Sequence, residues 1–272
     1  NFGYGLHSHY QPKAIYFLKT LVDTTNRIYQ NTNRDLEFSK SHHLVLGYDH
    51  SFNSSFRIKA EAYYQHLYNI PVEEDPSYYS LVNYGLSYYL NSRDSLTNGG
   101  IARNYGIDIT LEKFLSNNFY FLTTLSLFDS KYRDGNDVWR NTIYNSKFVI
   151  NVLGGYEHQV GDNNSIAIDI RGSSSGGLWS IPVKEELSVQ TGEVHYDFAN
   201  AYTHQNKDYF RLDLRLSYKM NKSKFSQEWA LDITNVTNRL NHFIREFDPD
   251  TGEYTETSQQ RIMPMMFWRI MF

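Results

Sequence analysis

The sequence predicts an all-β protein, an antiparallel up-and-down transmembrane β-barrel with about ten strands in these 272 residues. Three observations predict this fold: long segments with alternating apolar and polar residues, connections that are alternately short and long, and a 16% aromatic content that includes 23 tyrosines. Period-two alternation gives a strand one apolar and one polar face. Segments of about nine to eleven residues suit a bilayer, whereas strands in soluble proteins usually have about five or six.

Alternating segments recur along the chain. They are expected at residues 41–52, 56–68, 102–114, 165–172 and 208–220. The last segment has Phe, Leu, Leu, Leu, Tyr and Met at the even positions 210–220, with Arg, Asp, Arg, Ser and Lys between them. Residues 119–128 are apolar on both faces, and Asn235 interrupts the alternation of residues 232–239. A bulge or the barrel rim would explain both departures.

The connections differ at the two ends of the predicted strands. Short turns rich in Asn, Ser, Gly or Asp are expected at residues 52–55, 115–118, 160–164 and 220–224. Long polar loops are expected at residues 11–40, 71–102, 133–145, 179–206 and 241–258, with residues 78–90 as a candidate hairpin arm inside the second. Short turns at one end and long loops at the other indicate an outer-membrane barrel with extracellular long loops.

Composition excludes several classes of function. The net charge of -4 is spread along the chain and offers no basic surface for nucleic acid. There are no cysteines for disulfides, thiolate metal sites or nucleophiles. Apolar runs are too short for a membrane-spanning helix. The segment NFGYGLHSHY has no signal-peptide pattern, so we expect a signal peptide either to have been removed or to lie upstream in a longer chain.

A soluble β-sandwich or large soluble barrel is the alternative fold. Such proteins also have alternating strands, but their strands are usually shorter. The many charged residues on the non-apolar faces and the length of the segments favour the membrane barrel.

Two motifs then connect the chain to a family. ARNYGIDITLEK, residues 102–113, looks like the family's alternating strand after a loop, and EWALDITNVTNR, residues 228–239, is similar to the Asn-Val/Leu-Thr-Asn motif of its penultimate strand. Through almost its whole length the sequence resembles the C-terminal barrel half of TonB-dependent receptors, particularly those of Bacteroidetes.

The resemblance implies a barrel of about 22 strands that contains a plug domain and imports scarce nutrients with energy supplied through TonB. This chain lacks a plug and a TonB box, so residues 1–272 are expected to form the C-terminal portion of the barrel, with Asn1 in mid-barrel. The implied partners are outer-membrane lipid, the barrel-assembly machinery, the TonB complex, the plug and a surface lipoprotein. No cofactor is implied.

Charged residues on the polar faces are the candidate functional residues. Such side chains would contact the plug or the substrate, or would pair with one another across neighbouring strands. The candidates are Asp108, Glu112, Asp169, Arg171, Arg211, Asp213 and Arg215.

Catalytic and metal sites are weaker hypotheses. A hydrolase at the rim would use His195, Asp197, Asp134 or Asp137, but no spacing connects these residues, and loop Asp and His residues are more often simply solvated. His7 and His9 share one face and could form a ligand pair, although a metal site needs more ligands. Adjacent His42 and His43 point to opposite faces. We therefore predict neither an enzyme nor a metal site.

The chain ends on the alternating segment QQRIMPMMFWRIMF. Phe272, Ile270 and Trp268 lie in one lipid-facing row with Met266 and Pro264, whereas Arg269 points the other way. A terminal aromatic residue on such a strand resembles the signal read by the barrel-assembly machinery.

The predicted function is TonB-dependent uptake of a scarce nutrient across the outer membrane, with siderophore, haem, cobalamin, glycan and peptide left open. A self-contained ten-stranded passive pore or surface-binding barrel is the first alternative, and a rim-active outer-membrane hydrolase is the second.

Overall fold

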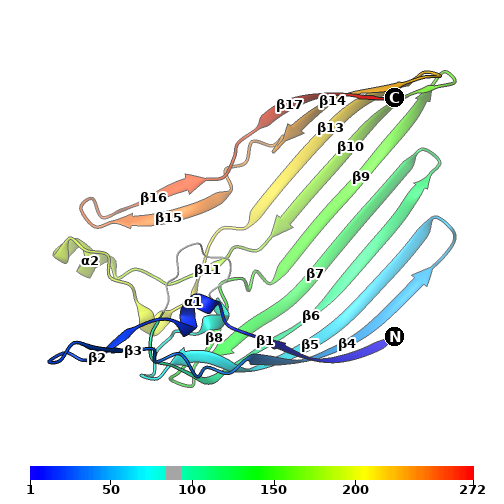
Figure 1. The fold of residues 1–272 in the computed structure, drawn as a ribbon. Coiled ribbons are helices and arrows are strands. Elements are labelled where there is room, and N and C mark those ends of the chain that lie inside the picture. Colours follow the sequence, from blue (N-terminus) through cyan, green and yellow to red (C-terminus); the bar gives the residue numbers. More distant parts are fainter. Residues whose placement is uncertain (84–92) are drawn as a thin grey trace.

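Ten long strands form one antiparallel sheet, which we call the wall. In the computed structural model, the described residues are 1–83 and 93–272. The strands follow one another in chain order across the sheet: β1 Phe2–His9, β4 Ser39–Ser51, β5 Phe56–Glu73, β6 Leu96–Ser116, β7 Phe119–Arg133, β9 Phe148–Val160, β10 Asn164–Ser175, β13 Tyr209–Asn221, β14 Ser226–Thr234 and β17 Met263–Met271. A short strand, β8 (Trp139–Asn141), pairs with β7. Figure 1 shows this curved sheet with β1 and β17 at its edges. The predicted ten-stranded up-and-down arrangement is confirmed.

The short turns occur where the sequence predicts them. They lie at residues 52–55, 117–118, 161–163 and 222–225. Asn117 and Asn118 have φ of 51° and 71°, which is the left-handed pair that a two-residue type I′ hairpin turn requires. These turns all lie at one end of the wall (Figure 1).

The long connections contain more regular structure than the sequence predicted. We call their described residues the loop cap; they belong to the ranges 10–38, 74–95, 134–147, 176–208 and 235–262. They hold the helices α1 (Lys13–Tyr16) and α2 (Glu185–Thr191), the 3₁₀-helices η1 (Leu81–Asn83) and η2 (Phe198–Asn200), and three small hairpins: β2 (Thr20–Asp23) with β3 (Ile28–Gln30), β11 (Trp179–Ser180) with β12 (His204–Gln205), and β15 (His242–Asp248) with β16 (Glu253–Ser258).

The sequence did not predict helix α2, because strand alternation does not reveal a helix of only two turns. Glu185 and Glu186 lie in its first turn, where acidic side chains favour the helix dipole. Gly192 ends it with φ of 71°. No helix among the described residues is long and apolar enough to cross a membrane.

The predicted boundaries of the second loop were too wide. β5 has 18 residues and β6 has 21, so both continue into the region predicted as loop 71–102. Ile70 of β5 and Leu96 of β6 are buried in the core at the long-loop end, and this packing supports the extended strands. Of the candidate arm at 78–90, residues 84–90 lie outside the described residues, and the described part holds an isolated bridge at Ser80 and η1 rather than a strand.

The two faces of the wall have opposite character. On the apolar face, large side chains are exposed, as with Leu46 at 64% and Met266 at 87%. The register aligns these residues across the sheet: Ile168, for example, is opposite Tyr156 and Leu216. An apolar surface this continuous needs an apolar medium.

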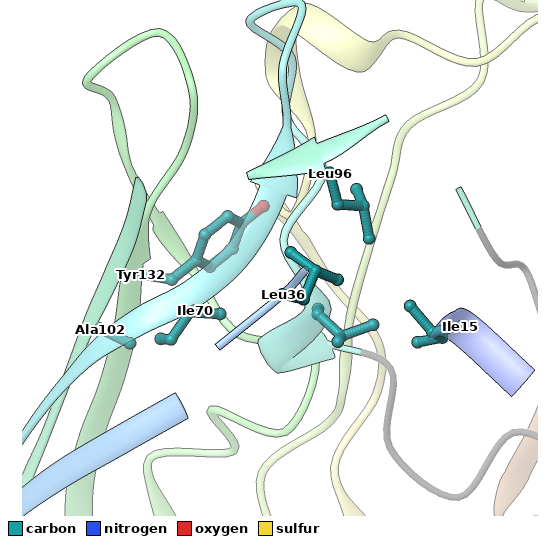
Figure 2. Packing of buried hydrophobic residues seen from close by; sticks show 7 residues of the cluster. Ile15, Leu36, Ile70, Leu96, Ala102 and Tyr132 are labelled. Carbon is teal, nitrogen blue, oxygen red and sulfur yellow. The ribbon is translucent and has the colours of Figure 1, made fainter. Parts of the chain in front are cut away.

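The buried hydrophobic core lies at the long-loop end. Figure 2 shows Ile15, Leu36, Ile70, Leu96, Ala102 and Tyr132 converging from loop and strand ends. Ile15, Ala102 and Tyr132 are fully buried. The loop cap is therefore a packed layer that is continuous with β5, β6 and β7.

Candidate functional site

All seven predicted charged residues share the polar face of the wall. One rung of paired residues runs Arg57, Glu112, Leu122, Leu153, Arg171 and Asp213 across six strands. Asp169 is opposite Arg215, and Arg211 is opposite Ser173. Asp108 is opposite Glu61 and Ser126. Strand alternation therefore places all seven on the side away from the apolar surface.

Five of the seven line one hollow in the wall. This wall hollow has a volume of about 310 Å³, and its charged lining residues are Asp169, Arg171, Arg211, Asp213, Arg215 and Asp232. They come from β10, β13 and β14. Glu112 and Asp108 lie apart on β6.

Most charges around the wall hollow are paired. Arg211 Nε donates to Asp213 Oδ1 over 2.7 Å on the same strand. Arg215 bridges two carboxylates of β14, with 2.7 Å to Glu228 and 3.2 Å to Asp232. This is the cross-strand pairing that the alternation predicts for opposite charges.

Asp169 and Arg171 complete the wall hollow differently. Asp169 accepts a hydrogen bond from the Tyr120 hydroxyl over 2.7 Å. The side chain of Arg171 has no ion pair or hydrogen bond with the residues that the structure describes. Arg171 stands opposite Asp213 in the register, and its guanidinium N–H groups have no hydrogen-bond acceptor among the described residues.

The β6 residues belong to a second set of contacts. Glu112 lies 3.8 Å from Arg57, which also pairs with Asp49. Asp108 faces Glu61, whose carboxylate pairs with Lys59 over 2.5 Å. The structure therefore does not bring Asp108 and Glu112 to the wall hollow.

A larger cavity lies in the loop cap. This cap cavity has a volume of about 790 Å³, which is within the range of small-molecule sites. Its aromatic lining residues are Tyr78, Trp179, Tyr196, Phe198, Tyr202, Phe243, Phe247 and Tyr254, and its charged or histidine residues are Arg93, Glu185, His204, His242 and Arg245.

Arg245, whose Nε lies 4.0 Å from Glu256, forms one corner of the cap cavity. Its guanidinium carbon lies 3.6 Å from the centroid of the Tyr254 ring, and Nη1 donates to His204 Nε2 over 3.2 Å. The Tyr254 hydroxyl donates to Glu185 over 2.9 Å. Burial, followed by this hydrogen bond, raises the pKa of Tyr254, so the ring stays neutral beneath the cation.

Stacked rings form another part of the lining of the cap cavity. The rings of Tyr78 and Phe198 stack with centroids 4.6 Å apart and planes 4° apart. Tyr202 lies against Tyr78 and Tyr132. Burial raises the pKa of Tyr202 to about 12. These rings present an aromatic surface that suits the flat rings or apolar edges of a ligand.

Buried polar contacts hold the segments around the cap cavity together. Arg140 pairs with Asp134 over 2.5 Å, with both side chains buried, and also donates to the carbonyls of Ala199 and Ala201. The Tyr132 hydroxyl donates to the carbonyl of Tyr78 over 2.7 Å. These contacts join loops that are about 60 residues apart in sequence.

Sequence reasoning missed the cap cavity. Arg245, Tyr254 and Trp179 lie in loops in which we predicted no binding residues. The available signal was the density of aromatic residues in 179–206 and 241–258, because solvated loops rarely need buried rings.

The residues considered for hydrolysis do not converge. His195 is hydrogen-bonded to Thr191, and Asp197 accepts from Asn200. Asp137 pairs with Arg133 over 3.3 Å, and Asp134 is held by Arg140. Local structure accounts for all four residues.

The histidine pair behaves similarly. His7 and His9 lie on the polar face opposite Ser41 and Ser39, and the His7 ring is 6.0 Å from His43. Among the described residues, no three His, Cys, Asp or Glu side chains group as metal ligands.

The C-terminal strand has the predicted alternation. Trp268 is opposite Trp229, and Ile270 is opposite Gln227, so both belong to the apolar face with the exposed Met266. Arg269 lies 3.7 Å from Glu228 on the polar face. Recognition of Phe272, Ile270 and Trp268 by an assembly machinery stays a prediction.

Asn235, which interrupts the predicted alternation, ends β14 at the rim. It has φ of 50° and is buried, its amide N–H donates to Asp213, and its side chain donates to the carbonyls of Arg239 and Gln260. Asparagine suits a left-handed turn residue that must also make these bonds.

Comparison with known proteins identifies the wall. The family model for the TonB-dependent receptor-like β-barrel matches residues 3–238. No curated protein sequence matches the chain.

Solved structures share the fold. The ferric-catecholate import receptor Fiu from E. coli K12 matches with a TM-score of 0.59 and 13% identity over 98% of this chain and 32% of that one. An FpvAI–pyocin S2 complex matches with a TM-score of 0.60 and 12% identity over 98% of this chain and 30% of that one. The ferric preacinetobactin receptor BauA from Acinetobacter baumannii matches with a TM-score of 0.59 and 11% identity over 86% of this chain and 30% of that one. The chain spans about a third of these proteins.

Proposed function

The chain belongs to the TonB-dependent receptor-like β-barrel family, and from that premise we propose that it is the C-terminal portion of a receptor wall in the bacterial outer membrane. The receptor takes up a scarce nutrient, with the long loops facing outward and TonB supplying the energy. A plug domain would be encoded outside these 272 residues. This proposal is supported by the solved receptors, because the chain matches only about a third of the length of each one.

The cap cavity is the observation that carries this proposal. It combines a volume of about 790 Å³ with stacked rings and the Arg245 cation at the long-loop end of the wall. A pocket of this composition captures a ligand with an acidic group and flat or apolar surfaces. Among siderophore, haem, cobalamin, glycan and peptide, this chemistry favours an anionic chelate, and two of the similar solved receptors are named for ferric compounds.

The polar face is proposed to line the lumen. Asp108, Glu112, Asp169, Arg171, Arg211, Asp213 and Arg215 would then face the plug or the passing ligand, because the interior of such barrels is polar. Paired residues such as Arg215 keep the wall rigid, whereas Arg171 is available to an acidic group of plug or ligand. The barrel-assembly machinery, a surface lipoprotein and the Bacteroidetes type also remain proposals.

A binding experiment tests the cap cavity. The full-length receptor is expressed on cells, and binding of a ligand panel covering the five classes is measured for the wild type, Arg245→Gln and Arg261→Gln. Losing the cation should weaken binding about tenfold. Arg261 is a matched control because it is an exposed cation of the same loop outside the cap cavity. Equal affinity of the wild type and Arg245→Gln for every bound ligand would refute the site.

Uptake separates the receptor from the passive pore. With TonB inactivated, receptor-dependent accumulation of the ligand should stop while surface binding persists. Continued uptake without TonB would support the self-contained pore instead.

A further inference from the structure

The apolar face of β5, β6 and β7 changes chemistry in successive rungs toward the long-loop end. The first rung considered is apolar and consists of Ala62, Ile107 and Leu127. The next holds two tyrosines and a carboxylate: Tyr64, Tyr105 and Asp129. The third is entirely basic in residue type: His66, Arg103 and Lys131. On the lipid-facing surface of a membrane protein, apolar residues lie in the bilayer core, tyrosines lie at its interface, and basic residues lie beside the headgroups. The three rungs follow this order.

The third rung, which we call the basic rung, places like residues side by side. Arg103 is directly opposite Lys131 on one neighbouring strand and His66 on the other. Like charges in direct cross-strand register destabilise a sheet unless something neutral or anionic separates them. The rung is therefore better suited to a bound anion than to an empty surface.

Arg103 is the centre of the basic rung. Its guanidinium carbon lies 4.3 Å from the centroid of the Trp139 ring. It makes no ion pair with the residues that the structure describes, and its Nε is buried without a hydrogen-bond partner. The cation is thus held against the indole ring, with no carboxylate paired to it among the described residues.

Nearby carboxylate does not neutralise the basic rung. Asp129 pairs with Lys147, lies 4.0 Å from Lys131 and accepts from the Tyr105 hydroxyl over 3.1 Å. On β4, His42 is opposite His66, and Lys40 lies one rung further out. One shared carboxylate among these bases leaves an excess of positive charge.

We propose that the basic rung binds the phosphate of an anionic lipid headgroup in the leaflet at the long-loop end. The rung lies on the outward face directly beyond the tyrosines, where headgroups rather than bulk solvent meet the protein. Strand β5 supports this placement, because the nine residues from Phe56 to Tyr64 fill the length that a membrane strand needs. The inference rests on the orientation proposed above, but not on transport or on any ligand.

Lipid retention by the full-length receptor tests the proposal. The receptor is purified in neutral detergent, and native mass spectrometry measures binding of an added lipid with a phosphomonoester headgroup against a phosphocholine lipid. The wild type should prefer the phosphomonoester. The double variant Arg103→Gln, Lys131→Gln should bind it about twenty-fivefold more weakly, at roughly fivefold for each cation lost.

Three further variants control for charge, position and folding. The charge-preserving double variant Arg103→Lys, Lys131→Arg should keep binding, and Lys59→Gln should bind like the wild type because Lys59 lies on the polar face of β5. The single variant His66→Gln supplies a milder change if the double variant does not fold. Equal binding of both lipids, or unchanged binding in Arg103→Gln, Lys131→Gln, overturns the proposal.

Inorganic phosphate distinguishes the source of the anion. Added at millimolar concentration, it should not displace the lipid; displacement would assign the basic rung to a free anion and overturn the lipid assignment. Because no nutrient is present in this assay, failed uptake and failed lipid binding are scored independently.

Discussion

The wall and the loop cap are stabilised in opposite ways. In the wall, large apolar side chains such as Leu46 and Met266 are exposed and depend on the surrounding medium. In the loop cap, Ile15 is fully buried, and the charged groups Arg140 and Asp134 are buried as well. The surrounding membrane thus stabilises the wall, whereas buried side-chain packing stabilises the loop cap. Polar substitutions should affect the two regions differently.

The largest effect is expected from Arg140→Ala. The change leaves the buried Asp134 carboxylate without its partner and frees the carbonyls of Ala199 and Ala201, at a cost of about 3 to 5 kcal/mol. Hydrogen exchange should accelerate in the loop cap while the wall stays protected. Arg133→Ala is the control, since its exposed pair with Asp137 should contribute less than about 1 kcal/mol. Uniform loss of protection throughout the wall would contradict separate stabilisation.

A charge on the apolar face of the wall should have the next largest effect. Ile168→Lys places an ammonium group in lipid and should destabilise the barrel by about 2 to 4 kcal/mol. Ala167→Lys, one residue earlier on β10, points to the polar face and should be tolerated. Equilibrium unfolding in lipid vesicles measures both. Equal destabilisation by the two variants would show that the faces are assigned wrongly.

A smaller effect is expected where strand and loop cap meet. Tyr132→Phe removes the hydroxyl that donates to the Tyr78 carbonyl, and the loss should be about 1 kcal/mol. Because Tyr78 lines the cap cavity, ligand binding should weaken with the stability of the wall unchanged. Proteolysis of the loop cap and unfolding of the wall, measured on one sample, separate the two results.

The last prediction concerns pH and involves only the loop cap. The pKa of Tyr202 is raised from 10.0 to about 12 by burial, so above pH 10 the folded loop cap holds a proton that the unfolded chain loses. Loop-cap stability should therefore fall as pH rises through this window, and Tyr202→Phe should reduce the slope. Ultraviolet absorbance of tyrosinate reports the titration, and an identical slope in the variant would rule out Tyr202 as its source.

The sequence predicts the wall well because its determinants are local. Alternation of Ile166, Ile168 and Ile170 is enough to assign two faces, and Asn117–Asn118 is enough to assign a turn. The predicted charged residues fall on one face for the same reason. Their grouping was not predictable, because alternation does not say that Asp169 meets the Tyr120 hydroxyl.

The loop cap resists such prediction because its contacts are long-range. The buried amide of Asn33 donates to the Arg93 carbonyl and accepts from the Leu96 amide, across about 60 residues. Neither residue type nor spacing identifies these partners. The corner formed by Arg245, Tyr254 and Glu185 likewise combines two loops that are 69 residues apart at its hydrogen bond.

Strands β5 and β6 extend to the edge of the loop cap, and this extension has a consequence for the shape of the hairpin. The two strands form a long β-hairpin, and the core residues Ile70 and Leu96 lie near its long-loop end. The pairing shifts twice along this part of the hairpin, between Leu67 and Ile70 and between Ile70 and Val72, and Asn69 has φ of 55°. Because a bulge bends its strand, the hairpin departs at this point from the direction of the regular ladder.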